Sequence, residues 1–235
     1  MTKLTDEVLG LIAEASEEER IDILQALRRG IFLHPLEKAW NVPAEAILAA
    51  ISRSPDITQR GIRGILAEAV FEQSIIPPLL AKGWEQLQIS GHQPYDFRLS
   101  KERRQVGIQV KLQRKESGNP MEYPSTRRKH LVKAPKRLFC VEVQKTRSGR
   151  AGGEATRPYH FGDFDILAVS LHPSSGDWKR FVFTVGKWLL PRENAPELIE
   201  IFQPVPDRSD SYWSDDLETC INWSQARERK TLYRK

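Results

Sequence analysis

Residues 94–115 contain two stretches in which apolar and polar side chains alternate. The apolar positions are Tyr95, Phe97 and Leu99 in the first stretch and Ile108, Val110 and Leu112 in the second. Such alternation puts one set of side chains on one face of a β-strand and the intervening set on the other. A slip of one residue would exchange the two faces, so the alternation constrains how the two strands pair as well as where they lie in the sequence. It predicts two amphipathic strands, over 95–99 and 106–113.

The spacing between these strands also predicts their register. A four-residue hairpin loop over 101–104 would join them, and the apolar faces then coincide. The predicted pairs are Ser100 with Gln105, Phe97 with Ile108, Asp96 with Gln109, and Tyr95 with Val110. In this register Asp96, Gln109 and Lys111 point to one side, with the Cβ atoms of Asp96 and Gln109 about 5 Å apart. A carboxylate beside further hard oxygen ligands can hold Mg²⁺, and a neighbouring lysine can orient water or offset charge on a phosphate.

Positive charge is concentrated in the same part of the chain. Residues 101–150 contain fifteen lysines and arginines but four acids, a local charge of +11 in a chain whose net charge is +5. A concentrated positive field suits a polyanion, because neutralised phosphates release condensed counterions. Charge alone is also compatible with a solvated basic face or an acidic protein partner. Nucleic acid is the partner that the charge pattern favours.

Residues 1–57 are expected to form a helical extension, because apolar side chains recur there at three- and four-residue spacing. Residues 34–40 and 44–53, separated by Asn41-Val42-Pro43, fit a helix-turn-helix. If that unit binds DNA, its contacts would come from Glu45, Ser52 and Arg53.

The remaining residues, 58–235, are expected to form one α/β domain around a central mixed sheet flanked by helices. Thr58 is expected to cap a helix that runs to Ser74, and Gly83 to end a further helical segment. The other predicted strands are 84–89, 138–144, 164–171 and 180–185, with loops at 117–125 and 146–156. Trp84, Trp178 and Trp188 are expected in the core, whereas the role of 188–235 is open.

Pro94-Tyr95-Asp96 followed by Gln109-Val110-Lys111 resembles the motif of the PD-(D/E)xK nucleases, as it occurs in type II restriction endonucleases. The resemblance covers residues 61–185, by order of elements more than by identity. It implies a restriction-endonuclease-like core, Mg²⁺ as cofactor and double-stranded DNA as substrate. It also implies a glutamate on the preceding helix, where RGILAEAVFEQ offers Glu68 and, one turn later, Glu72; Glu68 is preferred. GDFDILAVSLH resembles the aspartate-bearing strand that follows the lysine strand in the family.

Two departures from the motif shift the expected roles. Tyr95 stands between the proline and the aspartate, and an amide, Gln109, replaces the second carboxylate. The catalytic set is therefore Asp96, Gln109, Lys111 and Glu68. The expected metal ligands are Asp96, Glu68, Gln109 and the carbonyl of Val110, because the loss of one acid shifts metal binding onto the others.

DNA contacts are expected from the basic segment that follows the lysine strand. The predicted residues are Arg114, Lys115, Asn119, Arg127, Arg128, Lys129, Lys133, Arg147 and Arg150. Tyr123 and Tyr159 are candidates for stacking or groove contacts. A site-specific restriction enzyme is the first interpretation, a repair or junction nuclease the second, and a DNA-binding protein on a decayed nuclease core the third. A two-fold homodimer would suit cutting of both strands, although a monomer could cut them in turn.

Several other classes of protein are disfavoured. The chain has no apolar run of the roughly 20 residues needed to cross a membrane, and its polar start lacks the pattern of a signal peptide, so a cytoplasmic protein is expected. Cys140 and Cys220 are too few for a disulfide framework and are expected as buried thiols. The five histidines show no metal-ligand spacing, and neither a nucleophile elbow nor a phosphate-binding P-loop occurs.

Overall fold

The computed structural model describes residues 2–28, 34–132, 134–145, 150–151, 154–155, 158–226 and 228–234. The chain divides into two compact units, residues 1–59 and 60–235. Among the described residues, no helix has the length and apolar character to cross a bilayer.

The first unit contains four helices among its described residues: α1 (Lys3–Glu14), α2 (Glu17–Arg28), α3 (Pro35–Trp40) and α4 (Ala44–Arg53). The predicted helix, turn and helix at 34–53 are confirmed. His34 caps α3, and Asn41 ends it in the left-handed conformation at φ 52°. The buried carboxylate of Glu37 accepts hydrogen bonds from the backbone amides of His34 (2.9 Å) and Ala44 (2.7 Å), so it ties the two helices together.

The three residues of this unit named as DNA contacts are engaged within the unit itself. Glu45 forms an ion pair with Arg28. The side chains of Ser52 and Arg53 both donate to the carbonyl of Ala49, at 3.1 Å each, while remaining exposed. In these contacts Glu45 has a charged partner, whereas Ser52 and Arg53 bond to a backbone carbonyl. DNA binding by these residues stays a prediction.

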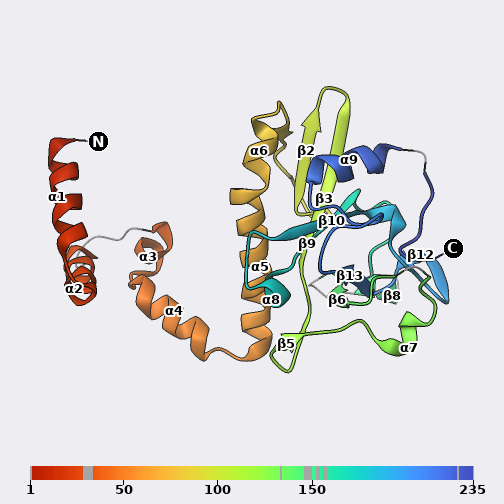
Figure 1. Cartoon of the computed structure of the whole chain (residues 1–235), viewed down its shortest axis with the longest axis horizontal. Helices are drawn as coiled ribbons and strands as arrows, with labels where there is room; N and C mark the ends of the chain where they lie inside the picture. Colours follow the sequence, from red (N-terminus) through yellow and green to blue (C-terminus); the bar gives the residue numbers. More distant parts are fainter. Residues whose placement is uncertain are drawn as a thin grey trace. The chain divides into compact units, whose positions relative to one another are not determined.

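A central five-stranded sheet organises the second unit, in the order β1-β2-β3-β9-β10. Its strands are β1 (Glu85–Gln86), β2 (Phe97–Lys101), β3 (Arg104–Leu112), β9 (Ile166–Ser170) and β10 (Phe181–Val185). β3 and β9 run parallel, and the other neighbours are antiparallel. The predicted mixed sheet with flanking helices is confirmed (Figure 1).

The second unit also contains helices and short strands outside this sheet. The helical ones are α5 (Asp56–Ser74) from residue 60 onward, α6 (Ile76–Leu80), α7 (Ser125–Arg128), α8 (His172–Ser175), the short 3₁₀ turn η1 (Gly186–Trp188) and α9 (Leu217–Gln225). Short strands form the pairs β4 (Lys115–Glu116) with β5 (Asn119–Pro120), β6 (Leu138–Glu142) with β13 (Phe202–Pro206), β7 (Arg150–Ala151) with β8 (Glu154–Ala155), and β11 (Pro191–Arg192) with β12 (Ala195–Ile199).

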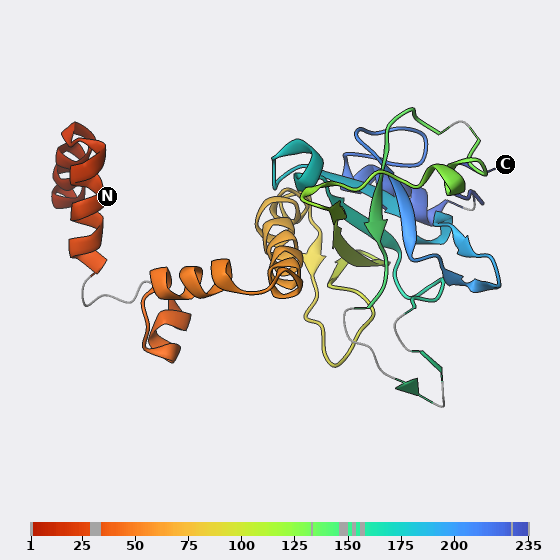
Figure 2. The ribbon, with the colours of Figure 1, turned by 90° about the horizontal axis from the view of Figure 1, so that it is seen from below.

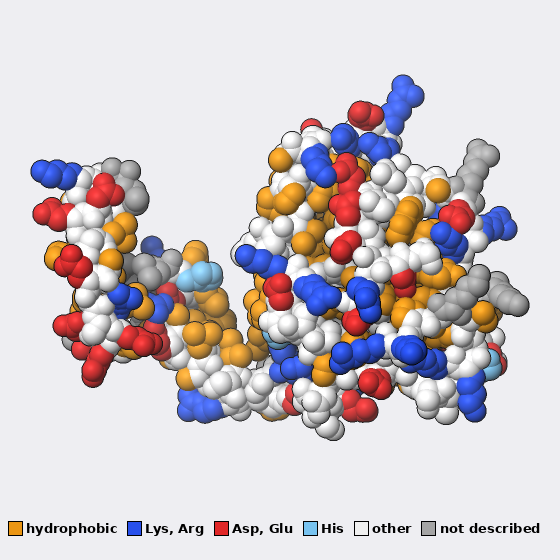
Figure 3. All heavy atoms as spheres, viewed as in Figure 1, with side chains coloured by type: hydrophobic (Ala, Val, Ile, Leu, Met, Phe, Trp, Pro, Cys, Tyr) orange, Lys and Arg blue, Asp and Glu red, His pale blue; other side chains and the backbone are white. Residues whose placement is uncertain are grey.

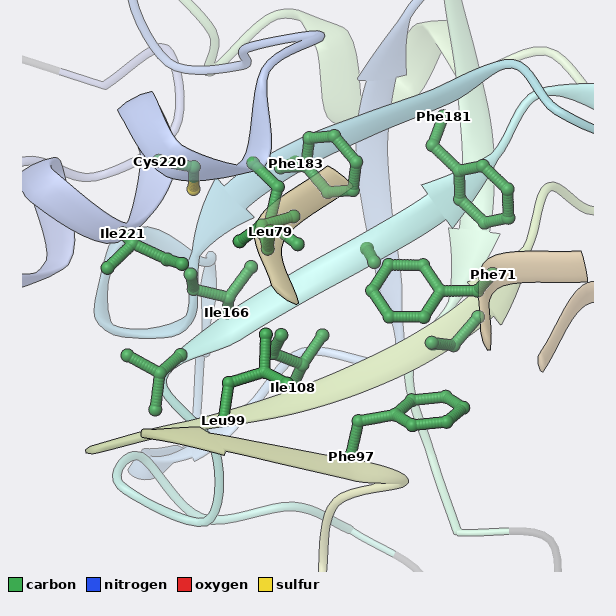
Figure 4. Packing of buried hydrophobic residues seen from close by; sticks show 14 of the residues in the cluster. Phe71, Leu79, Phe97, Leu99, Ile108, Ile166, Phe181, Phe183, Cys220 and Ile221 are labelled. Atoms are coloured by element: carbon green, nitrogen blue, oxygen red, sulfur yellow. The ribbon is translucent and has the colours of Figure 1, made fainter. Parts of the chain in front are cut away.

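The two faces of the sheet are covered differently. One face packs on α5, α6 and α9 around Phe71, Leu79, Ile108, Phe183 and Ile221 (Figure 4). Viewed at right angles, α5 lies end-on beside the strands (Figure 2). The other face carries a second apolar cluster. It is closed by the β6–β13 ladder and by the C-terminal segment, whose residues Trp213, Leu232 and Tyr233 are buried there.

The hairpin register is the predicted one, but the loop is shorter. Phe97 pairs with Ile108 and Ser100 with Gln105, as expected. The ladder continues to Lys101 and Arg104, so the loop has two residues rather than four. Glu102 adopts φ 56° to close this tight turn.

Two other predicted boundaries were wrong. α5 begins at Asp56, and the amide of Thr58 bonds to the carbonyl of Pro55, so Thr58 lies inside the helix rather than at its cap. The strand expected over 84–89 is only Glu85–Gln86. The strand predicted over 138–144 is confirmed as β6, which ends at Glu142 and pairs with β13 outside the central sheet. Sequence periodicity reports burial and local conformation, and neither of these reveals a strand's partner.

Predictions about buried aromatics and thiols were mostly right. Trp84 and Trp188 are buried, and Trp178 is partly buried and stacks on His172. Cys140 and Cys220 are free and buried. Tyr123, a candidate for stacking or groove contacts, is 5% exposed within the second cluster, and this burial contradicts that role.

Phe71 connects α5 to two strands of the sheet, because its ring contacts Phe97 of β2 and Phe181 and Phe183 of β10. Its ring lies 5.1 Å from that of Phe97 and 5.6 Å from that of Phe181. We expect Phe71→Ala to lower the free energy of unfolding by about 3–5 kcal/mol, because it leaves a cavity under the sheet. Urea denaturation followed by tryptophan fluorescence measures this. Ile65→Ala, on the same helix but 64% exposed, is the matched control and should change stability by less than about 0.5 kcal/mol.

Candidate active site

Asp96 is fixed to β3 by its backbone and by its side chain. Its amide donates to the carbonyl of Ile108 at 2.9 Å. Its Oδ2 accepts a hydrogen bond from the amide of Val110 at 2.8 Å and another from the side-chain nitrogen of Gln109. The carboxylate is therefore held against β3 just before β2 begins.

Tyr95 does not lie where the alternation placed it. The ladder starts at Phe97, so the period-two rule no longer applies at Tyr95, and the predicted pair with Val110 is wrong. The ring packs instead against the second cluster and over Gly107. A Cβ at position 107 would lie 3.1 Å from this ring, so the glycine permits the close approach.

Gln109 is buried, and its amide has partners at both ends. It is 2% exposed. Its Nε2 donates to Asp96 and, at 3.2 Å, to the carbonyl of Val110. Its Oε1 accepts a hydrogen bond from the hydroxyl of Tyr159 at 3.0 Å. Gln109 thus joins the β2–β3 hairpin to a tyrosine fifty residues further along the chain.

Glu68, Asp96 and Lys111 form one electrostatic group. Burial, and then the charge of Asp96, raise the pKa of Glu68 to about 7, against a smaller opposing effect of Lys111. Burial also raises the pKa of Asp96, while Lys111 and the Val110 amide lower it. Burial lowers the pKa of Lys111, and the charges of Asp96, Glu68 and Glu142 raise it. Two poorly solvated carboxylates therefore share one lysine.

Of the two helix glutamates, Glu68 is the one that the fold brings to this group. Glu72 is exposed and accepts a hydrogen bond from the side chain of Gln86 at 3.0 Å. The two positions are one turn apart on α5, where small differences in helix rotation decide which side chain faces the sheet. The sequence left this choice open.

The residues present fit a magnesium ion. Asp96, Glu68 and the Val110 carbonyl are hard oxygen donors, and Mg²⁺ in proteins commonly uses one or two carboxylates together with water and substrate phosphate. Among the described residues, no group of three or more acids, histidines or cysteines could hold a metal by itself. Mutual repulsion between Glu68 and Asp96, evident in the raised pKa of Glu68, would be relieved by a cation. Gln109 presents its nitrogen, not its oxygen, to this group.

The predicted DNA contacts fall into two sets. Arg114 is paired with Glu142, Arg127 with Glu200 at 3.1 Å, and Arg128 donates to the carbonyl of Pro135. Lys115, Asn119 and Lys129 are exposed, and Arg127 is exposed as well despite its ion pair. Basic side chains lie over the part of the second unit that contains β5 and α7 (Figure 3). Lys133 and Arg147, and the side chain of Arg150, fall outside what the structure describes.

Sequence reasoning assigned Tyr159 a different role and did not single out Lys145, although both lie beside the site. Tyr159 was named for stacking, but its ring is 4% exposed and its hydroxyl bonds to Gln109. Lys145 lies with its Nζ 5.2 Å from the centroid of that ring and 3.3 Å from a carboxylate oxygen of Asp163. Lys111 approaches the same ring, at 5.7 Å from its centroid. No local spacing signals contacts between segments so far apart in sequence.

Comparisons with known proteins add little to this geometry. No protein-family model matches the chain, and no curated protein does. Among solved structures, a bacterial homing endonuclease, I-Ssp6803I, is similar at 21% sequence identity and a TM-score of 0.33. The match covers 54% of this chain and 69% of that one. A TM-score this low does not establish a shared fold, so the likeness supports no conclusion about function.

Stability should depend on pH through Glu68. Its pKa in the folded protein, about 7, lies above the ordinary value of 4.5, so the folded state binds this proton more tightly than the unfolded state does. Glu68 therefore destabilises the protein above pH 7 and has no such effect below pH 4.5. We expect Glu68→Gln to raise the free energy of unfolding in EDTA at pH 8 by about 2–3 kcal/mol. The gain should shrink as the pH falls from 7 to 4.5.

Urea denaturation at pH 8, 6 and 4.5 measures this gain. Glu72→Gln is the matched control, because the same chemical change occurs one turn along α5 at an exposed position. If the gain for Glu68→Gln is the same at all three pH values, the pKa of Glu68 is not raised as described.

Proposed function

We propose that this protein is a magnesium-dependent DNA endonuclease of the PD-(D/E)xK type, acting at specific sites as a type II restriction enzyme does. The observation that carries the proposal is the grouping of Asp96 and Lys111, from the β2–β3 hairpin region, with Glu68 of α5. The carbonyl of Val110 lies near this group, because Gln109 Nε2 donates both to it and to Asp96. Two carboxylates and a lysine in a poorly solvated site suit hydrolysis of a phosphodiester better than a structural role, because unneeded buried charges destabilise a fold.

Each residue has a role that follows from its position. Asp96 and Glu68 would hold magnesium together with the Val110 carbonyl. The bound ion would polarise the phosphodiester and stabilise charge on the leaving oxygen. Lys111 would hold the attacking water in line with the phosphorus through its N–H groups, and its positive charge would offset that of the phosphate.

DNA would be held by basic residues beyond β3. Lys115 and Lys129 are exposed and suit contacts with backbone phosphates, whereas Asn119 on β5 suits a base edge. The side chain of Arg127 is less available, because Glu200 pairs with it. Two copies related by a two-fold axis would place one site on each strand of a palindromic sequence.

Lys111→Ala tests the chemistry directly. We expect cleavage of a long DNA in Mg²⁺ to fall by about a thousandfold or more, because charge stabilisation and water positioning are both lost. DNA affinity should stay within about threefold, because Lys111 is one partly buried charge among many exposed basic ones. Gel analysis of the fragments measures cleavage, and a band-shift assay measures affinity. Lys179→Ala, at an exposed position on another loop, is the control and should cut normally.

The pattern of products separates the competing functions. Discrete fragments of a long DNA in Mg²⁺, absent in EDTA, would support site-specific cleavage. Nicking only at branched or mismatched DNA would support a repair or junction nuclease. A shifted but uncut band under all conditions would support a DNA-binding protein and overturn the proposed catalysis.

Salt dependence tests the proposed phosphate contacts. Each contact that is lost should lower the slope of log affinity against log salt by about one. We expect this change for Lys115→Ala and for Lys129→Ala, measured by fluorescence anisotropy between 50 and 200 mM salt. Lys101→Ala is the comparison variant. Its Nζ is held by the carbonyl of Lys82 at 2.8 Å, so its loss should leave the slope unchanged.

A further inference from the structure

The orientation of the Gln109 amide is dictated by its surroundings. Nε2 faces two oxygens, Oδ2 of Asp96 and the carbonyl of Val110, and Oε1 faces the hydroxyl of Tyr159. The reverse orientation would point Oε1 at the same two oxygens in a buried site, where oxygens repel unless a positive group lies among them.

Those two oxygens are also the ones proposed to bind magnesium. A cation and an N–H group are both positive, so Nε2 cannot share Asp96 Oδ2 and the Val110 carbonyl with a cation at close range. Without the ion, the Nε2 group of Gln109 satisfies both oxygens by donating hydrogen bonds to them.

We propose that magnesium binding turns the side-chain amide of Gln109. Oε1 then faces the ion as a ligand, and Nε2 donates to the hydroxyl oxygen of Tyr159. This inference rests on the proposed function, because it requires Asp96 and Val110 to bind a divalent cation. Tyr159 is a positioning residue in this scheme, since it acts through Gln109.

The hydroxyl of Tyr159 suits both orientations. A phenol can donate one hydrogen bond and accept others, so it can donate to Oε1 in one orientation and accept from Nε2 in the other. Its ring is held in place by edge-to-face packing on Phe164, with centroids 5.2 Å apart, and is buried in the second cluster. The hydroxyl therefore stays beside the amide whichever way the amide points.

Removal of the Tyr159 hydroxyl takes a hydrogen-bond donor from Oε1 in one orientation of the Gln109 amide and an acceptor from Nε2 in the other. In Tyr159→Phe without magnesium, Nε2 keeps its two acceptors and only Oε1 loses a donor. With magnesium bound, Nε2 would lose its acceptor, and buried N–H groups without partners are rarer than underused carbonyls. We therefore expect Tyr159→Phe to weaken Mg²⁺ binding about fivefold. In a Gln109→Glu background, which has no N–H to satisfy, the same change should not weaken it.

The side-chain amide protons of Gln109 give a direct readout by ¹H–¹⁵N NMR. They are assigned by their absence in Gln109→Glu. In the wild type, we expect both protons to shift when Mg²⁺ replaces EDTA. In Tyr159→Phe, their positions in EDTA should match those of the wild type. In Mg²⁺ they should move to the positions of amide protons without hydrogen bonds.

Calorimetric titration with Mg²⁺ separates this inference from the proposed function. If no Mg²⁺ binds in a manner that Asp96→Asn abolishes, the proposed metal site fails. If Mg²⁺ binds but the wild-type amide protons do not move, or move equally in Tyr159→Phe, the amide does not turn and this inference alone is overturned. The wild-type titration needs no variant to fold, and the phenylalanine retains the ring packing.

Discussion

Pairing between β2 and β3 is the interaction on which the rest of the second unit depends. The Phe97–Ile108 register sends the apolar side chains toward α5 and the polar side chains toward the second cluster. A slip of one residue would place Gln109 and Lys111 under α5 and turn Ile108 and Val110 to the opposite face of the sheet. One hydrophobic constraint therefore sets both the core and the place of the charged groups.

The sequence predicted this hairpin well because its information is local. Alternation over a few residues fixed the faces, and the short loop fixed the register. The prediction failed at Tyr95, where the chain leaves the ladder and alternation has no meaning. The sequence also did not predict the contact of Tyr159 with Gln109 or the pairing of β6 with β13. Those contacts join distant segments, and nothing in the local pattern encodes a partner.

Both the helical pattern of the sequence and the packing of α5 on the sheet determine that Glu68, and not Glu72, lies at the candidate site. Helical periodicity offers both positions, because residues four apart lie on one face. The packing of Phe71 against Phe97 and Phe181 fixes how α5 is rotated on the sheet. That rotation turns Glu68 toward Asp96 and Lys111 and leaves Glu72 in solvent, beside Gln86. Core packing thus selects a residue of the candidate site.

An amide at position 109 changes the charge balance of this group. A carboxylate there would add a third acid to Asp96 and Glu68 around Lys111, and its repulsion would have to be offset by a bound cation. Glutamine instead supplies N–H groups that satisfy Asp96 and the Val110 carbonyl from within the chain. These hydrogen bonds stabilise the protein without metal, and in the proposed magnesium site they would weaken metal binding, because a cation would first have to displace them. If the proposed site binds magnesium, the amide at position 109 would favour the folded protein without metal at the expense of metal affinity, and Tyr159 satisfies the oxygen of that amide on its other side.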